Sequence, residues 1–328
     1  MRRLGKKLAF VLAALACAAP LLLGAEKVRF VVIPNEVRNL SAIQVQQQRD
    51  SSARGVPRND SALCFSASCL VDAATHSVSM SQGASKPCGT VTVAAASDLT
   101  YAMNEIAANF QKATGCTVRL SMGSSGNFLS QIENGAPFDV FFSADIAYPK
   151  KLEAEGLAAP GSTYLYAIGK IVLWTRKDSR VDIGKGFAAL RDPAVQKIAI
   201  ANPQHAPYGR AAEEALRRSG VYEAVKDRLV LGENISQTAE FVESGNADAG
   251  ILALSLVLSP AMKDKGRVWN IPENLYTPIQ QGAVVVRAAA NPQSARQFLD
   301  YIMMPATAAL LERYGFALPA KISNGGKP

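Results

Sequence analysis

The sequence predicts an α/β fold of two lobes, each a mainly parallel β-sheet flanked by helices, with two crossover strands joining the lobes. Three observations carry this prediction. From Val91 onward, short apolar runs alternate with helical stretches of roughly 10–15 residues, which is the pattern of βαβ units. The same alternation begins again at Ala167. Near the C-terminal end, the run PIQQGAVVV reads as a strand that returns to the first group.

Composition limits the class of protein. The chain has 328 residues, 48% of them hydrophobic, which suffices for two lobes with their own cores. The formal net charge is +8, but the first 89 residues carry +6 of it and the remainder only +2. Because the remainder has no basic block and no basic stripe interleaved with aromatic residues, we expect no binding to nucleic acid. We also expect a monomer.

The N-terminus has the features of an export signal. Four basic residues precede the apolar run Leu8–Ala16, and Pro20 interrupts this run before it reaches the ~20 apolar residues that a membrane span needs. We therefore expect residues 1–25 to be a signal peptide. Cys17 leaves a lipid-anchored form open as an alternative.

Residues 26–89 differ from the rest of the chain. This segment is rich in Ser, Gln, Arg and Asn and shows no sustained periodicity, so we expect a disordered insert, with a binding tail as the alternative. A disulfide between Cys64 and Cys69 is compatible with an oxidising compartment. His76 and His205 have no partner at ligand spacing, and Cys-x-x-Cys is absent from the sequence, so no protein-bound metal or cofactor is predicted.

Lobe I is expected to consist of residues 90–168 and 283–328. Its first helix should bury one face, because apolar residues recur at i, i+3, i+4 and i+7, and Gly115 should end it. The four residues of that face are Met103, Ile106, Ala107 and Phe110. The expected strands of the first part are 91–96, 117–122 and 139–145, and two further helices are expected over 128–133 and 150–155. Helices over 293–303 and 306–314 should complete the lobe.

Lobe II is expected over residues 169–282. Strands are predicted over 167–174, 197–202 and 249–254, with helices over 210–218 and 237–243. Open α/β sheets bind ligands outside the carboxyl ends of their strands. A cleft between the two lobes is therefore the expected site, and we expect the lobes to swing about the crossovers near Gly169 and Gly282.

Two strand-to-helix junctions in lobe I carry serines. In AAASDL, Ser97 occupies the expected N-cap position and Asp98 the first turn, and in GSSGN, Ser125 follows the second strand. A serine at a helix start is most often only a cap. Adjacent parallel strands, however, would bring both junctions to one sheet edge, where hydroxyls and free N–H groups at the helix starts can bind an anion.

Lobe II offers two matching junctions. NPQHAPYG leaves a strand and enters a helix near Tyr208, and Ile235 begins another helix after Asn234. Four helix N-termini around a cleft could hold a small dianion without one cationic side chain. Hydrogen bonds to a charged partner contribute roughly 1.5–3 kcal/mol each, so such a set could bind tightly.

From Val91 to Pro319 the chain resembles the periplasmic molybdate-binding proteins of ABC transporters, in the type II solute-binding protein family. The matching motifs are AAASDLTYAM, GSSG with QIENGAP, DVFFSAD, YAIGKIVLW, NPQHAPYG, NISQTAEFVESGNADAGIL and RYGF. The resemblance implies a non-enzymatic, two-lobed periplasmic protein that closes on molybdate or tungstate and delivers it to a membrane permease.

By position in those motifs, the resemblance also implies the binding residues. Ser97 and Ser125 would donate hydroxyl and backbone hydrogen bonds to the oxyanion. Asp98, Tyr208 and Ile235 would each contribute a backbone N–H.

Two departures from the family pattern leave alternatives open. Ala253 stands where some members place a tyrosine donor. The Asp98 carboxylate would repel a dianion, or accept a hydrogen bond from a protonated one, if it faced the ligand; we expect it to face away. Sulfate, phosphate or another small anion is the alternative ligand. A secreted hydrolase is the alternative class, although GSSGN lacks the Gly-x-Ser-x-Gly order and His205 has no partner Asp by motif.

Overall fold

The computed structural model describes residues 88–319, which lie within one compact unit, Val78–Pro328. The expected signal peptide over 1–25, the pair Cys64 and Cys69, and nearly all of the expected insert over 26–89 fall outside the described residues. Within 88–319, every helix is too short or too polar to cross a membrane.

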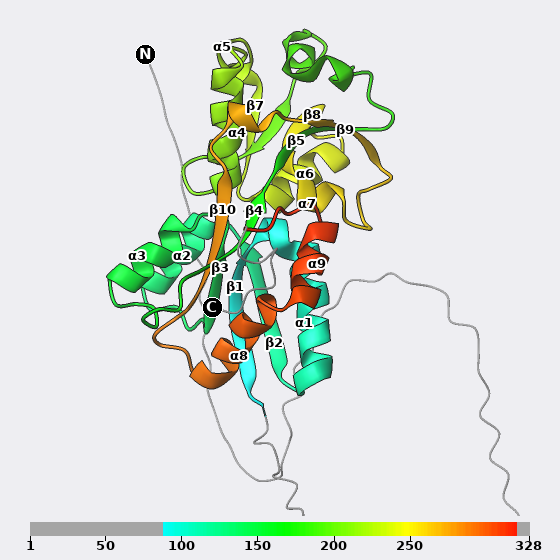
Figure 1. Cartoon of the computed structure of the whole chain (residues 1–328). Coiled ribbons are helices and arrows are strands. Elements are labelled where there is room, and N and C mark those ends of the chain that lie inside the picture. The colour runs from blue at the N-terminus through cyan, green and yellow to red at the C-terminus, as the bar shows by residue number, and fades with distance from the viewer. Residues whose placement is uncertain (1–87, 320–328) are drawn as a thin grey trace, which may run out of the picture. The chain divides into compact units, whose positions relative to one another are not determined.

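Two five-stranded sheets form the framework (Figure 1). The first has the order β2-β1-β3-β10-β4 and the second β7-β6-β8-β5-β9. The first sheet comprises β1 (Thr90–Ala96), β2 (Thr117–Gly123), β3 (Val140–Ser143), β4 (Tyr164–Gly169) and β10 (Ile279–Val285). The second comprises β5 (Ile171–Arg176), β6 (Ile198–Ala201), β7 (Leu229–Gly232), β8 (Ala249–Ala253) and β9 (Gly266–Asn270). We call the first sheet with its helices lobe I and the second with its helices lobe II.

Both sheets are mixed. In lobe I, β1 pairs in parallel with β2 and β3, whereas β10 runs antiparallel to β3 and β4. In lobe II, β6 pairs in parallel with β7 and β8, whereas β5 runs antiparallel to β8 and β9. The predicted α/β two-lobed fold is confirmed, and the antiparallel pairings come from the strands at the crossovers.

Residues 167–174 were predicted to form one strand, but they belong to two strands in different sheets. β4 ends at Gly169 and β5 begins at Ile171, so that the chain passes from the first sheet to the second at Lys170. The apolar run is continuous, which is why its pattern could not show the change of sheet. The return crossover follows β9, and β10 enters the first sheet at Ile279, opposite Gly169. Residues 279–282 therefore pair in the first sheet, although the expected division gave them to lobe II.

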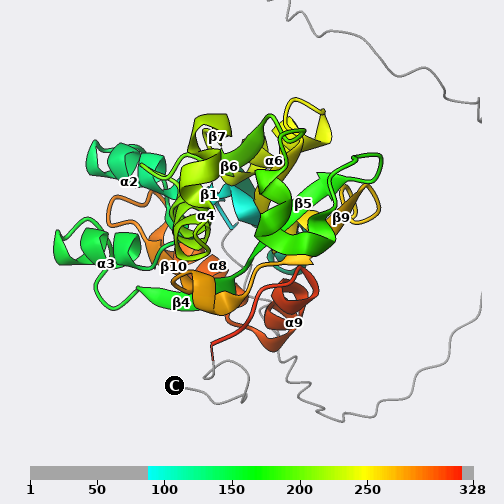
Figure 2. The ribbon, with the colours of Figure 1, turned by 90° about the horizontal axis from the view of Figure 1, so that it is seen from above.

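Helices cover both faces of the first sheet. α1, α8 and α9 lie on one face, and α2 and α3 lie on the other (Figures 1 and 2). Their bounds are α1 (Thr100–Thr114), α2 (Ser125–Glu133), α3 (Ala147–Ala154), α8 (Pro292–Ile302) and α9 (Pro305–Arg313). Lobe II carries α4 (Pro207–Arg218), α5 (Tyr222–Val225), α6 (Ile235–Glu243) and α7 (Leu254–Val257). Single 3-10 turns are η1 (Ser97–Leu99), η3 (Lys226–Arg228) and η4 (Glu273–Leu275), and the longer 3-10 segment η2 (Ile183–Arg191) has a kink at Gly186.

The packing of α1 follows the predicted face. All four residues of that face are buried, and Gly115 ends the helix with φ of 75°, a conformation that favours glycine. Phe110 packs edge-to-face on Phe298 of α8, with ring centroids 4.9 Å apart. This cluster fixes α1 against the sheet, and with it the start of the helix that faces the cleft.

A disulfide joins Cys88 to Cys116, a pairing that was not predicted. It ties the residue just before β1 to the connection between α1 and β2. The pairing could not be predicted from the sequence, because Cys88 stands at the end of the irregular segment. The bond closes a loop of 28 residues, and it holds β1 beside β2 at the end of the sheet opposite the cleft.

Reduction of this disulfide should lower the free energy of unfolding by about 3 kcal/mol, because the unfolded chain regains the freedom of the closed loop. Chemical denaturation with and without a thiol reductant measures the effect. A Cys88→Ser/Cys116→Ser variant serves as the control, since its midpoint should not respond to reductant. A wild-type midpoint that reductant leaves in place would contradict the assignment.

Candidate ligand-binding site

The carboxyl ends of strands from both sheets meet at one small cavity, in which the centre of a water-sized sphere has about 10 Å³ of space. It is lined by Ala96, Ser97, Asp98, Gly123, Ser124, Ser125, Ala144, Ala206, Pro207, Tyr208, Asn234 and Ile235. The structure thus brings all five predicted site residues into the wall of one cavity. Among the described residues, no Lys, Arg or His lines this wall.

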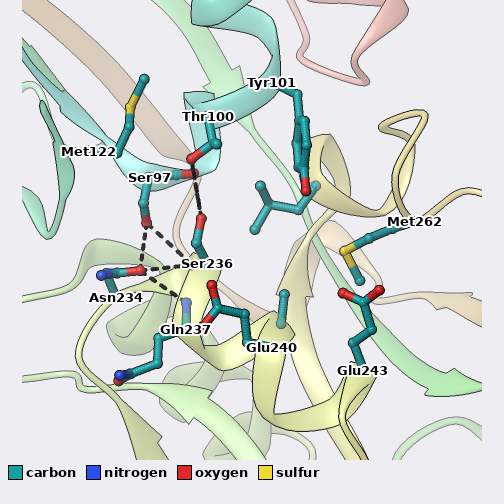
Figure 3. Close-up of a pocket in the computed structure, with 12 residues that line it drawn as sticks. Ser97, Thr100, Tyr101, Met122, Asn234, Ser236, Gln237, Glu240, Glu243 and Met262 are labelled. Atoms are coloured by element: carbon teal, nitrogen blue, oxygen red, sulfur yellow. Dashed lines mark hydrogen bonds between the residues drawn. The ribbon is translucent and has the colours of Figure 1, made fainter. Parts of the chain in front are cut away.

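Ser97 is not the N-cap that the sequence predicted. The chain enters α1 through the 3-10 turn η1, whose N-cap position is Ala96. The Ser97 hydroxyl instead reaches lobe II, where it donates to Asn234 Oδ1 at 3.1 Å and accepts from the Ser236 amide at 3.3 Å (Figure 3). Ser236 Oγ in turn donates to the Ser97 carbonyl at 2.9 Å. This serine therefore links the two lobes beside the cavity.

Ser125 is the first residue of α2 and lies 1% exposed. Its Oγ accepts a hydrogen bond from the Ala144 amide at 2.9 Å. A hydroxyl has one hydrogen to donate as well as lone pairs that accept. Because the Ala144 contact uses only a lone pair, the Ser125 hydroxyl retains its hydrogen for another acceptor.

The neighbouring residues form a second contact between the lobes, which the sequence did not reveal. Ser124 Oγ and the Gly126 amide both donate to the carbonyl oxygen of His205, at 2.6 and 2.9 Å. A Cβ at Gly126 would lie 2.6 Å from that oxygen. Only glycine allows the start of α2 to approach His205 this closely.

The helix starts of lobe II present free amides. α4 begins with Pro207, and α6 is capped by Asn234, whose Oδ1 accepts from the Ser236 and Gln237 amides at 3.0 and 3.1 Å. The first amides of a helix have no partner within the helix. Among the described residues, the amides of Ser125, Tyr208 and Ile235 have no backbone acceptor outside the regular elements. These three amides mark where the wall can bind an anion.

The side chain of Asp98, which belongs to η1, takes part in a buried polar network. Its Oδ2 accepts from the Tyr208 hydroxyl at 2.9 Å and from Gln281 Nε2 at 2.6 Å, and Gln281 Oε1 accepts from the Tyr166 hydroxyl at 2.6 Å. Oδ1 has no partner among the described residues. Burial raises the pKa of Asp98 to about 7, against a smaller lowering by the hydrogen bonds from Gln281 and Tyr208 and by the backbone amides of Asp98 and Leu99. Gln281, on the crossover strand β10, gave no signal in the sequence.

An ion pair forms a third contact between the lobes. Arg210 of α4 lies 2.6 Å from Asp145 Oδ2 and 2.9 Å from the Tyr148 hydroxyl, both in lobe I. On the other side of the cavity, a groove beside Ser97 is lined by Tyr101, Met122 and Met262 and carries the carboxylates of Glu240 and Glu243 (Figure 3). The Ser97–Asn234 contact and the Arg210–Asp145 ion pair therefore join the lobes at two places beside the cavity.

Metal-ligating side chains do not gather at the cavity among the described residues. Between residues 88 and 319 no three His, Cys, Asp or Glu residues gather as a metal site would require. Ala253, where a tyrosine donor was considered, ends β8 in a buried position and does not line the cavity. Two residues on, Ser255 Oγ donates to the Asp98 carbonyl at 2.8 Å.

Comparison with known proteins agrees with this geometry. A family model described as bacterial extracellular solute-binding protein matches residues 91–317. The molybdate-binding protein ModA of Rhodobacter capsulatus is 43% identical over 228 residues, which cover 70% of this chain and 88% of the relative. The solved structure of the periplasmic molybdate-binding protein of Azotobacter vinelandii has a TM-score of 0.66 and 39% identity, and the match covers 70% of this chain and 99% of that chain.

A more distant likeness shows the fold alone. The sulfate-binding protein SubI of Mycobacterium tuberculosis H37Rv is 13% identical, with a TM-score of 0.59 over 72% of this chain and 90% of that chain. The nearer relatives are binding proteins by name, which supports the expected non-enzymatic binding protein over the hydrolase alternative. From the family match over both lobes and the identity to these relatives, the chain belongs to the family of bacterial extracellular solute-binding proteins.

Proposed function

We propose that the cavity binds molybdate, and also tungstate, and that the protein delivers the anion to the permease of an ABC transporter. The observation that carries this proposal is the shared wall of Ser97, Asp98, Ser125, Tyr208 and Ile235, contributed by both lobes and free of cationic side chains. The identity to molybdate-binding relatives supports this choice of ligand.

Neutral donors can hold such a ligand. The positive ends of the helix dipoles and the free amides at the starts of α2, α4 and α6 point to one place, so a dianion finds several hydrogen bonds there. The hydroxyl of Ser125 adds one donor, and that of Ser97 adds another once it turns from Asn234. Hydrogen bonds to a charged acceptor contribute roughly 1.5–3 kcal/mol each.

Binding should favour the closed arrangement of the lobes. A ligand shifts a conformational equilibrium only by binding one state better, and an anion held from both lobes meets all its donors only when the lobes are together. The crossovers near Gly169 and Gly282 are the proposed hinges. A Cβ at Gly169 would overlap the Tyr208 hydroxyl, so this hinge position also has to be glycine for the lobes to meet. A permease would then distinguish the closed form from the open one.

Function in the periplasm, after removal of residues 1–25, fits the chemistry of the chain. A disulfide such as Cys88–Cys116 persists in oxidising compartments and is rare in the cytosol. We infer that the protein acts there as a monomer, with a lipid anchor at Cys17 as the alternative to a free form.

Thermal unfolding of the exported protein with molybdate, tungstate, sulfate and phosphate at equal concentration tests the ligand. At one hundred times Kd, a ligand that binds only the folded state adds about 2.7 kcal/mol of stability, which raises Tm by roughly 5–10 °C. We expect this rise with molybdate and tungstate alone. A rise only with sulfate or phosphate would show that the protein binds another oxyanion and not molybdate.

Replacing Ser97 and Ser125 by alanine should raise the Kd for molybdate at least tenfold for each serine, because each loses a donor to a charged ligand. Isothermal titration calorimetry measures the change. Ser162→Ala is a matched control, since Ser162 is equally buried in lobe I but bonds Ala159 and Val285 away from the cavity. Tight binding by the double variant would show that these serines do not hold the anion.

Gly126→Ala should weaken molybdate binding more than tenfold while leaving the Tm without ligand close to that of the wild type. The added Cβ meets the His205 carbonyl only when the lobes are together. The substitution should therefore destabilise the closed form of the protein and not its folding. Gly184→Ala is the control, because its Cβ would meet only the flexible Asp182 side chain. Unchanged affinity of Gly126→Ala would argue against closure as part of binding.

A further inference from the structure

We propose that the Asp98 side chain is protonated in the ligand-bound protein and donates a hydrogen bond from Oδ1 to the anion, so that binding of a dianion takes up one proton from solution. This inference rests on the proposed function, because it assigns a role to a residue of the same cavity. No covalent bond of the ligand changes. The proton comes from the buffer and stays on the carboxyl group.

The hydrogen bonds of Asp98 decide where the proton would sit. Both donors in the network, the Tyr208 hydroxyl and Gln281 Nε2, bond to Oδ2. Oδ1 is buried and has no partner in the described part of the chain, although Asp98 lines the cavity. A protonated carboxyl has one O–H to donate. With Oδ2 already accepting twice, Oδ1 is the atom that can carry the hydrogen, and a ligand oxygen would give it an acceptor.

The surroundings of Asp98 do not neutralise a charge there. The titratable groups closest to it are the hydroxyls of Tyr208 on α4 and Tyr166 on β4, whose own pKa values are raised well above the usual one by burial and by Asp98. β10 contributes the neutral Gln281, and α7 contributes Ser255. Arg210 of α4 is the nearest arginine along that helix, and it pairs with Asp145.

Charged side chains on the other elements packed against η1 are exposed or form ion pairs with other residues. On α1, Glu105 pairs with Arg313 and Lys112 is exposed. Arg119 of β2 is exposed, as is Glu240 of α6, and Glu243 of α6 pairs with Lys265. The remaining charges of α4 pair along its outer face, Glu213 with Arg217 and Glu214 with Arg218.

Charge repulsion then sets the direction of the proton movement. Burial raises the pKa of Asp98 to about 7 despite the hydrogen bonds that lower it. A dianion in the same cavity disfavours the ionised carboxylate further, because like charges interact strongly in a low-dielectric interior. In an open form, where water reaches the cleft, the pKa of Asp98 should lie lower. The bound form therefore holds a proton that the open form lacks, and the Kd for a dianion rises as the pH rises.

Calorimetric titration of the wild-type protein with molybdate tests this directly. Measured at about pH 7.5 in two buffers of different ionisation enthalpy, the difference in heat should correspond to nearly one proton taken up per anion. Between about pH 7 and about pH 9 the Kd should rise by up to tenfold per pH unit. Asp98→Asn, whose amide keeps an N–H donor without a charge, should show no proton uptake and a Kd independent of pH.

His205, whose carbonyl oxygen accepts from Ser124 and Gly126 at the contact between the lobes, provides the control variant, His205→Gln. It should retain the slope of Kd with pH, whatever its affinity. Proton uptake near zero in the wild type, or a slope that disappears in His205→Gln and persists in Asp98→Asn, would overturn the inference while leaving the proposed ligand in place. If Asp98→Asn does not fold, the proton count on the wild-type protein decides the question alone. Failure of the wild type to bind molybdate at any pH would overturn the proposed function itself.

Discussion

The proposed function places one constraint on the structure, which is that a small anion has to be held without a cationic side chain. Backbone amides can do this only where they are free, and in a folded domain they are free at helix starts. β1, β2, β6 and β7 each end at the cavity and lead into a helical turn there. The two sheets thus place helix starts from distant parts of the chain around one point. Both sheets are mixed because the crossover strands must carry the chain from one lobe to the other and back.

The crossovers also connect the hinge to the site. Gln281 lies on the strand that re-enters lobe I, at the irregular step between Gln281 and Gly282, and bonds Tyr166 of lobe I and Tyr208 of lobe II. Its amide also contacts Asp98 at the wall of the cavity. A buried, fully bonded amide specifies one geometry, since any displacement would leave polar groups unpaired in the interior. The relative position of the lobes in the closed form is therefore fixed at the bottom of the cleft by hydrogen bonds.

What the sequence could predict was local. The apolar face of α1 and the serine junctions at Ser97 and Ser125 are patterns within a few residues, and parallel strands carry such junctions to a common edge. The division of residues 167–174 between two sheets, the Cys88–Cys116 bond and the contact of Ser124 with His205 depend on segments far apart in the chain. Ser97 shows the limit clearly, because its type and place suit an N-cap while its hydroxyl bonds Asn234 of the other lobe.

A carboxyl group in an anion-binding cavity needs a physical reason. If Asp98 were ionised with a dianion present, repulsion would oppose binding, and a neutral residue of the same shape would serve better. If it is protonated, the same group becomes a donor, and the two hydrogen bonds at Oδ2 hold the carboxyl group in one orientation. The Tyr208 hydroxyl reaches Oδ2 only when α4 of lobe II approaches lobe I, so closure and protonation favour one another. The charge state of one buried side chain would then link lobe position, ligand charge and pH.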